Sequence, residues 1–256
     1  MFVRLATLVL AFALAAACTP EATGTPPPSG RGTAIAAAPS QGSVPAGRWR
    51  AVLIAGDNNS PAFDNGVQSL REKLLAHGVT DISVYSSAMR TAPAQLASVA
   101  NVANALRTGG GDACLVFVTS HGEQKGFFLR ADRRLFDPRS LDRVLSAGCG
   151  SVPTVVVVSA CHSGTFLTPD MRKPNRLILT AAATDRTSFG CGTGDQYTYY
   201  DQCLLQQFDG AATWRELAVA TRSCVEGLER RMGMRPPSQP QMFVGVQVED
   251  LRLPSR

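Results

Sequence analysis

The sequence predicts an α/β protein in which helices cover both faces of an open, mostly parallel β-sheet. Short runs of Val, Leu and Ile, typical of strands buried on both faces, alternate with amphipathic stretches of helical spacing. No segment repeats another. The folded part is about two hundred residues long, the size of one domain. This pattern favours a single sheet with crossover helices.

The first half of the folded part predicts strands and helices in turn. The strands are short apolar runs, and the helices stop at a turn residue such as Gly78 or hold a proline in the first turn, as at Pro93. In chain order we expect a strand over Trp49–Ala55, a helix over Phe63–His77, a strand over Val79–Tyr85, a helix over Pro93–Leu106 and a strand over Cys114–Thr119.

The second half continues the alternation. Its clearest strand contains Pro153, which is acceptable only because it stands at the start of the strand. In chain order we expect a hairpin over Gly126–Leu129 and Arg134–Phe136, a helix over Pro138–Ala147, strands over Val152–Ser159 and Leu177–Ala182, a long helix over Ala211–Met232 and a strand over Gln241–Val248.

The first 47 residues predict a targeting signal and a tether. Met1–Cys18 has an early charge, an apolar stretch and then small residues, the order of a secretory signal. A cysteine directly after three alanines resembles a bacterial lipoprotein signal, so we expect an exported, periplasmic protein that a lipid on Cys18 anchors to the cell envelope. Cleavage after Ala17 to give a soluble periplasmic protein is the alternative. Residues 19–47 are rich in Pro, Ala and Gly and predict a disordered linker, which leaves 48–253 as the folded domain.

Composition and charge exclude several classes of protein. The chain is 45% hydrophobic and 18% charged, which excludes wholesale disorder and a polytopic membrane protein. The net charge is +5, but the basic residues are scattered, mostly as single arginines. Nucleic-acid binders usually concentrate Lys and Arg on one face, so we expect no nucleic-acid partner.

The loops after two predicted strands carry a histidine and a cysteine. His121 follows the strand over Cys114–Thr119, and Cys161 follows the strand over Val152–Ser159. Ligands of open sheets bind outside the carboxyl ends of the strands. An imidazole can take the proton of a thiol, and the thiolate can then attack a carbonyl carbon. The pair therefore predicts nucleophilic catalysis on an amide.

Each of these residues also has an ordinary explanation. A cysteine after an apolar strand is often core filling, and a loop histidine is often a surface residue. His162 is a rival base, but its side chain should diverge from that of Cys161 at a sharp turn. His77 stands at a helix end, where a capping or exposed role suffices. The joint occurrence of His121 and Cys161 at two strand ends favours the catalytic interpretation.

The two motifs resemble those of the legumain family of caspase-clan cysteine peptidases. They are VFVTSHG, a strand ending in His-Gly, and VVVVSACHSG, a strand ending in Ala-Cys-x-Ser-Gly. The runs AVLIAGDNN and LILTAAATDRTSFGC are similar to that family's first strand with its turn and to the strand and loop after the nucleophile. The likeness spans roughly residues 48–248. It implies a caspase-like three-layer sandwich with a mostly parallel six-stranded sheet and helices on both faces.

The resemblance implies a role for each residue of the two motifs. His121 would be the general base and acid, Cys161 the nucleophile, and the backbone N–H groups of Gly122 and Cys161 the oxyanion hole. The implied activity is that of a cysteine endopeptidase that acts on peptide or protein substrates through a thioester, with no cofactor. Transpeptidation by the same acyl-enzyme and an inactive peptide-binding scaffold are the alternatives.

Departures from the family pattern concern specificity. Members that cut after Asn carry an Arg shortly after the first strand and a Glu two residues before the nucleophile, where this chain has Asp64 and Ser159. Asp201 is the nearest match to a third pocket residue, and Ser188 is also expected to bind substrate. Such a pocket would be net negative and would prefer Arg or Lys before the scissile bond. Alternatively, Asp64 caps a helix that starts near Asn65.

The remaining cysteines can pair, because an exported protein matures in an oxidising compartment. They are Cys114, Cys149, Cys191, Cys203 and Cys224. We expect the pair Cys191–Cys203, in a polar loop, and at least one unpaired thiol. The chain has no CxxC, GxSxG or GxGxxG motif, so the sequence supports no thioredoxin-type site, serine-hydrolase site or dinucleotide site. A zinc site made of His121, Cys161 and His162 lacks carboxylate support, and we expect no metal.

Overall fold

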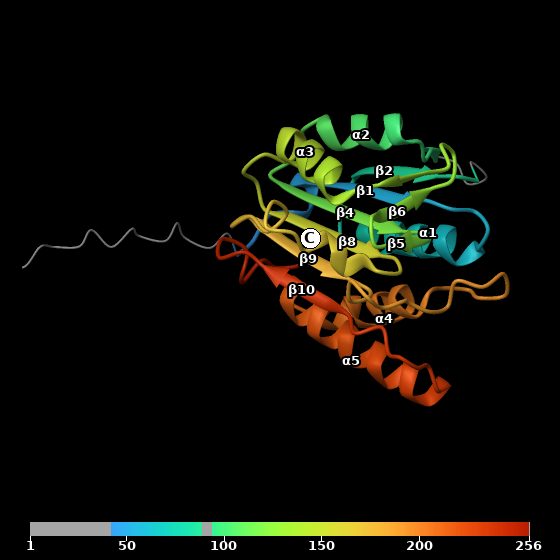
Figure 1. The fold of residues 1–256 in the computed structure, drawn as a ribbon. Helices are drawn as coiled ribbons and strands as arrows, with labels where there is room; N and C mark the ends of the chain where they lie inside the picture. The colour runs from blue at the N-terminus through green and yellow to red at the C-terminus, as the bar shows by residue number, and fades with distance from the viewer. Residues whose placement is uncertain (1–41, 89–93, 256) are drawn as a thin grey trace, which may run out of the picture. The chain divides into compact units, whose positions relative to one another are not determined.

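The computed structural model describes residues 42–88 and 94–255, and these residues form a seven-stranded sheet with a smaller sheet beside it (Figure 1). The order of the strands in the large sheet is β10-β9-β8-β4-β1-β2-β3, and β10 alone among them runs antiparallel to its neighbour. The strands are β1 (Trp49–Ala55), β2 (Asp81–Ser86), β3 (Gln95–Leu96), β4 (Ala113–Thr119), β8 (Thr154–Ser159), β9 (Arg176–Thr180) and β10 (Gln241–Val244).

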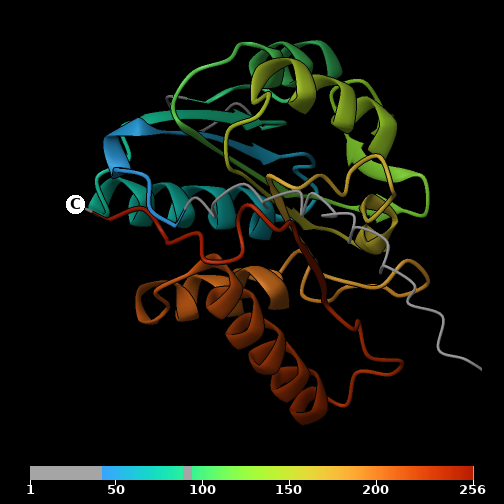
Figure 2. The same cartoon turned by 90° about the vertical axis from the view of Figure 1, so that its left-hand side faces the viewer.

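Helices cover both faces of this sheet. The helices α2 (Val99–Arg107) and α3 (Pro138–Gly148) cover one face, and α1 (Pro61–Ala76), α4 (Tyr199–Gln207) and α5 (Trp214–Met232) cover the other (Figure 2). Successive side chains of a strand point to opposite faces. In β4, Leu115 and Phe117 therefore pack into one hydrophobic core, and Val116 and Val118 into the other. This is the caspase-like sandwich that the resemblance implied, with a seventh strand added.

The small sheet follows β4 directly. It consists of β5 (Gly122–Glu123), β6 (Gly126–Leu129) and β7 (Arg134–Phe136), all antiparallel. The predicted hairpin has the bounds of β6 and β7. Three short 3₁₀ helices complete the described elements: Ala46–Arg48, Ser163–Phe166 and Phe208–Gly210.

The helices begin where the sequence supplies a capping side chain. Ser60 accepts a hydrogen bond from the Ala62 N–H and is followed by Pro61 at the first position of α1. Thr213 and Glu216 form a reciprocal capping box at the start of α5. These capping side chains determine the residue at which each helix begins. The spacing of apolar residues alone predicts that residue only to within a few positions.

Several predicted elements differ from the structure, and the last strand ends at Val244 and not at Val248, because a turn closes between the Gly245 carbonyl and the Val248 N–H. The helix expected over Pro93–Leu106 begins only at Val99, because Gln95 and Leu96 pair with the end of β2 as the edge strand β3. Helix α4 was not predicted, since TYYDQCLLQQ was taken as part of a polar loop. The expected linker ends too late: Val44 and Ala46 are buried, and the Trp49 indole N–H donates to the Val44 carbonyl.

The predicted disulfide Cys191–Cys203 was also wrong. Cys203 lies on α4 and pairs with Cys224 on α5, with 5.7 Å between their Cα atoms. Cys114 pairs with Cys149. Because Cys203 belongs to a helix whose inner face meets α5, its side chain is fully buried there instead of facing the loop that carries Cys191. Cys191 is unpaired, as is Cys161.

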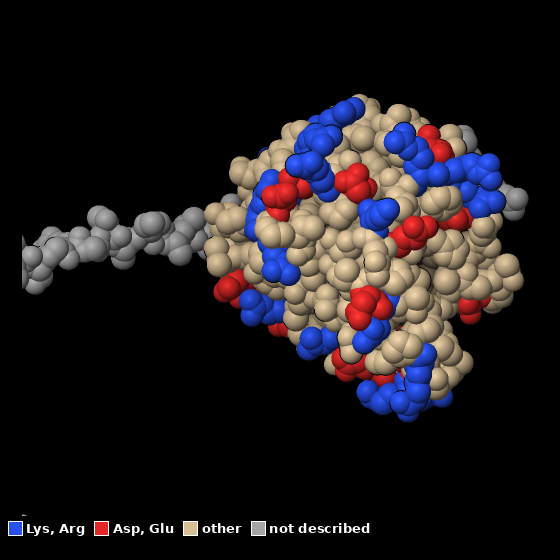
Figure 3. Space-filling view, in the orientation of Figure 1, with Lys and Arg blue, Asp and Glu red and all other residues tan. Residues whose placement is uncertain are grey.

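Neither basic nor acidic side chains dominate the face of the described part that Figure 3 draws. On the face drawn in Figure 3, basic side chains occur in small groups, most of them with acidic side chains beside them. Within residues 42–88 and 94–255, no helix has both the length and the apolar character needed to cross a bilayer.

Candidate active site

His121 and Cys161 stand at neighbouring positions on one edge of the sheet. The strands β4 and β8 are parallel neighbours, and their last residues, Thr119 and Ser159, are register partners. His121 and Cys161 each lie two residues beyond those partners. The in-register pairing of two parallel strands therefore brings the imidazole and the thiol to adjacent strand ends, although they are forty positions apart in the chain.

The turns that carry the two residues are in direct contact. A Cβ atom built on Gly122 would lie 2.4 Å from the Cys161 carbonyl oxygen and 3.3 Å from the Cys161 amide nitrogen. Only glycine lets the two backbones come this close. The two N–H groups expected to form an oxyanion hole thus belong to peptides that touch each other.

The position of His121 is fixed by its neighbours. Its backbone carbonyl accepts a hydrogen bond of 2.9 Å from the Phe128 N–H in β6. The ring of Phe63, in the first turn of α1, packs against the imidazole at right angles, with 5.1 Å between the centroids. An edge-to-face contact of this kind orients a ring. From the sequence, Phe63 was expected only as an apolar residue of a helix, and nothing in the sequence pattern indicates this contact.

The Cys161 thiol is half-buried and contacts the backbone of Ser188. The Ser188 N–H donates to Sγ at 3.3 Å, and Sγ lies 3.6 Å from the Ser188 carbonyl oxygen. Burial raises the pKa of the thiol, and the Ser188 hydrogen bond opposes that rise. Ser188, expected to bind substrate, thus lies beside the sulfur.

The side chain of His162 is engaged elsewhere. This residue has a left-handed backbone conformation (φ 56°), and its ring Nδ1 lies 2.9 Å from the Thr184 carbonyl oxygen. A carbonyl only accepts hydrogen bonds, so Nδ1 must carry the proton. The backbone N–H of His162 donates to the backbone carbonyl of Arg186. His162 therefore fastens the loop after β9 to the turn that holds Cys161, in the orientation expected for a residue that diverges from the thiol.

Asp201 and Ser159, two of the residues expected to bind substrate, belong to one buried cluster of hydrogen-bonded side chains. Thr119 donates to Asp201 Oδ2 at 2.6 Å, and Ser159 Oγ lies 3.3 Å from the Thr198 hydroxyl, which caps α4. The Asp201 side chain is fully buried, and its Oδ1 has no hydrogen-bond partner within the described residues. Burial raises the pKa of Asp201 to about 6, although hydrogen bonds from Thr119, Ser159 and Thr198 oppose the rise.

Asp64 belongs to a different group. It lies in the first turn of α1, and its carboxylate accepts a hydrogen bond of 2.5 Å from Ser86 at the end of β2. The same helix turns Gly66 toward Asp201, since a Cβ on Gly66 would lie 2.9 Å from Asp201 Oδ2. The Asp64 carboxylate therefore lies at the end of β2, and the Asp201 carboxylate lies at the end of β4. The alternative role of Asp64 as a helix cap was wrong, because Ser60 caps α1.

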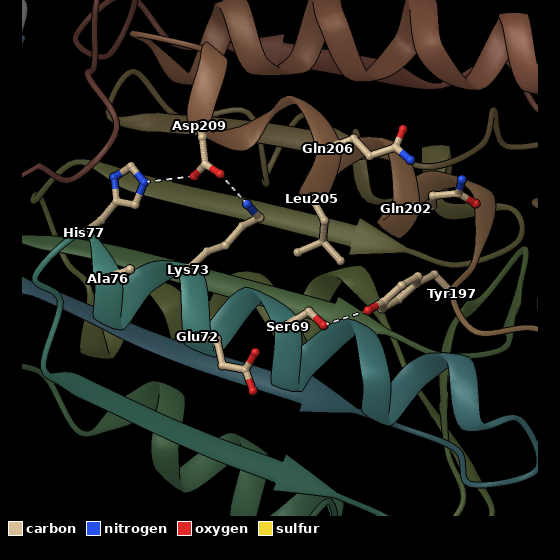
Figure 4. A pocket seen from close by; sticks show the side chains of 10 residues that line it. All are labelled: Ser69, Glu72, Lys73, Ala76, His77, Tyr197, Gln202, Leu205, Gln206 and Asp209. Carbon is tan, nitrogen blue, oxygen red and sulfur yellow. Dashed lines mark hydrogen bonds and ion pairs between the residues drawn. The ribbon is translucent and has the colours of Figure 1, made fainter.

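A separate cavity of about 710 Å³ lies between α1 and α4, away from both motifs (Figure 4). Asp209 bonds Lys73 and His77 at one end, and Ser69 bonds the Tyr197 hydroxyl at the other. The cavity is lined by Ser69, Glu72, Lys73, Ala76, His77, Tyr197, Gln202, Leu205, Gln206 and Asp209. Lys73, His77 and Asp209 are paired with one another, and neither His121 nor Cys161 is among the lining residues.

No metal site accompanies the histidine and the cysteine. Across the described ranges, no group of three or more His, Cys, Asp and Glu side chains is arranged to hold a metal ion.

Comparisons with known proteins agree with this geometry. The chain resembles the crystal structure of caspase-1 from Spodoptera frugiperda with a TM-score of 0.53, at 13% sequence identity, over 77% of this chain and 86% of that one. At this identity the likeness concerns the fold alone. Among curated proteins, none matches the chain at a significant level. The model of the peptidase C13 family matches residues 91–221, half of the chain, including both strand-end motifs. The chain therefore belongs to the peptidase C13 family, the legumain family of cysteine peptidases.

Proposed function

We propose that the chain is an endopeptidase in which Cys161 and His121 form the catalytic dyad. The observation that carries this proposal is the register of β4 and β8, which places the thiol and the imidazole at equivalent positions on adjacent strand ends. The contact between Gly122 and the Cys161 peptide supports it, because two N–H donors can then face one carbonyl oxygen.

The proposed reaction runs through a thioester. His121 takes the proton of the Cys161 thiol, and the thiolate attacks the carbonyl carbon of the substrate. The N–H groups of Gly122 and Cys161 hold the oxyanion. When the C–N bond breaks, the imidazolium gives its proton to the leaving amine. Water then attacks the acyl carbon of the thioester while His121 takes a proton from it. The C–S bond breaks, the acid product leaves, and the imidazolium returns its proton to the Cys161 thiolate.

Peptide hydrolysis by matched variants tests the dyad. We expect Cys161→Ala and His121→Ala to lower kcat/KM by at least about 10³-fold, because a dyad acts as a unit. His162→Ala should lower it by less than about tenfold, since its ring bonds a loop carbonyl. Loss of the same size in His162→Ala and none in His121→Ala would assign the base to His162. Mass spectra of the products separate hydrolysis from transfer to an added amine.

We also propose a preference for Arg or Lys before the scissile bond. Support comes from the chemistry of the pocket positions: no arginine stands at position 64, serine replaces glutamate at 159, and Asp201 has one oxygen without a partner among the described residues. A buried anion gains most from a cationic partner. Fluorogenic peptides that differ only in Arg, Lys, Asn or Asp at this position test the preference. Faster cleavage after Asn would contradict it.

For the location of the protein, we propose export and a lipid anchor at Cys18, a residue outside the described ranges. The two disulfides support maturation in an oxidising compartment. Metabolic labelling with a fatty-acid analogue should mark the wild type and leave Cys18→Ser unlabelled, with the variant in the soluble periplasmic fraction. Equal labelling of both would rule out this anchor.

A further inference from the structure

Cys191 is a free thiol that the proposed reaction does not use. It is half-buried and lies in the long loop between β9 and α4, thirty residues after Cys161. Cys114 in β4 and Cys149 just after α3 form one disulfide, and Cys203 in α4 and Cys224 in α5 form the other. The protein thus combines oxidised pairs elsewhere with two reduced thiols in one region of the fold.

Contacts of the loop place Cys191 close to Cys161. The Ser188 peptide touches the Cys161 sulfur through both its N–H and its carbonyl, at 3.3 and 3.6 Å. Cys191 comes three residues after Ser188, so the chain cannot carry it farther than about 10 Å from that contact. The charge of Cys161 also acts on Cys191: the pKa of Cys191 is raised first by burial and next by that charge.

Glycines flank Cys191 on both sides. Gly190 has φ +80°, a left-handed conformation that glycine adopts without strain, and Gly192 follows Cys191. The Gly192 carbonyl accepts hydrogen bonds from the Ser60 hydroxyl and the Asp195 backbone N–H, and the Gly192 N–H donates to the Asp195 carboxylate within the same loop. No helix or strand includes residues 181–198 of this loop.

We propose that Cys191 is a resolving cysteine that closes a reversible disulfide with Cys161 when a peroxide reaches the active site. The proposal rests on the role of Cys161 as the nucleophile, because the thiolate that attacks a carbonyl also attacks a peroxide oxygen. It adds an oxidative modification site to the proposed peptidase.

The reaction balances with hydrogen peroxide as the oxidant. The Cys161 thiolate attacks one peroxide oxygen, the O–O bond breaks, and hydroxide leaves, giving the sulfenic acid. The Cys191 sulfur then attacks the Cys161 sulfur, the S–O bond breaks, and water is released after transfer of the Cys191 proton. Two thiols and one peroxide become one disulfide and two waters. A thiol reductant reverses the step by exchange.

The disulfide between Cys161 and Cys191 would have two effects. It removes the nucleophile while the oxidant is present. It also removes the sulfenic acid before a second and third peroxide convert it to the irreversible sulfinic and sulfonic acids.

The test compares the wild type with Cys191→Ser and with Thr193→Ala, a control substitution in the same loop. Each protein is treated with hydrogen peroxide, assayed, reduced with dithiothreitol and assayed again. The wild type and Thr193→Ala should regain most of their initial activity. Cys191→Ser should start with normal activity and regain less than about a fifth of it, because its sulfenic acid is oxidised further.

Peptide mapping without reduction gives a readout that does not need activity. The wild type should yield a cross-linked peptide that joins Cys161 and Cys191, two hydrogen masses lighter than its parts, and Cys191→Ser should yield Cys161 with two or three added oxygens. Formation of the cross-link in a protein without peptidase activity would refute the proposed function alone. Absence of the cross-link, with equal recovery of all three proteins, would overturn the resolving role.

Discussion

At the scale of single residues, the orientation of the His121 imidazole depends on an edge-to-face contact with the ring of Phe63. Phe63 is fully buried and meets the imidazole at 84°. Such contacts contribute about 0.5–1.5 kcal/mol beyond burial. A histidine that must accept a proton from one side and deliver it to another needs this fixed direction.

Phe63→Leu should therefore lower kcat by about two- to tenfold while KM changes little, because leucine fills most of the space without orienting the ring. Phe117→Leu is the matched control: Phe117, in β4, is equally buried in the same hydrophobic core. Steady-state kinetics on both variants measure the effect. An equal fall of kcat in the control would show that general loosening of the core is the cause.

The buried carboxyl of Asp201 makes a prediction about stability and pH. Its folded-state pKa is about 6, against 3.8 as the ordinary value, so the folded protein binds more protons than the unfolded chain between these limits. Unfolding free energy should thus fall as pH rises from about 4 to about 6, by up to about 3 kcal/mol from this group. Asp201→Asn removes that fall.

Urea unfolding of the wild type and Asp201→Asn at pH 4 to 8 measures this difference. The variant should gain stability relative to the wild type as pH rises. Asp142→Asn is the matched control and should differ from the wild type by a nearly constant amount over this range, because Lys173 and Arg176 hold the pKa of Asp142 below its usual range despite its partial burial. A constant difference between Asp201→Asn and the wild type would mean that Asp201 ionises normally.

At the scale of elements, the disulfide Cys203–Cys224 joins two helices on the same face of the sheet. Helix α4 has only a few turns, begins at the Thr198 cap and packs on α5. The bond closes a loop of 21 residues. It holds in place the helix whose first turn carries Asp201.

Replacing both cysteines by alanine should lower the unfolding free energy by about 3 kcal/mol, since the unfolded chain regains the freedom of that loop. Thermal unfolding should move down by roughly 5–10 °C. Cys191→Ala serves as the control and should melt near the wild type, because Cys191 is unpaired. An equal loss in the control and in the double variant would support the pairing of Cys191 with Cys203 instead.

At the scale of the whole molecule, the described chain starts on the edge opposite His121 and Cys161. The Gly42 carbonyl accepts a hydrogen bond from Arg252, and the chain then enters β1 at its amino end. The two candidate catalytic residues follow the carboxyl ends of β4 and β8, at the other edge.

A chain that lacks residues 1–41 should therefore keep kcat/KM within about twofold of the full chain, since the sheet, both cores and both motifs lie within the described residues. Purified full-length and shortened proteins, assayed with one peptide, give the comparison. A tenfold loss in a shortened protein with an unchanged melting temperature would show that the first 41 residues contribute to the site.

The sequence by itself determined the class of the fold and indicated the two residues that we propose as the dyad. Continuous apolar runs such as those of β4 and β8 have few structural uses besides a buried parallel strand, and a parallel sheet puts the residue after each run on one edge. His121 and Cys161 could be named for that reason. Element bounds came within a few residues wherever an apolar period or a glycine marked them.

Tertiary structure alone decided which side chains meet. Phe63 contacts His121, Asp64 and Asp201 bond to different strands, and Cys203 faces Cys224, because helix rotation and packing set these pairs. A local pattern predicts the spacing of apolar residues along a helix, but it does not predict the element against which each face of the helix packs. Helix α4 shows the same limit, since its polar and aromatic residues become helical through a cap and a partner helix far away in the sequence.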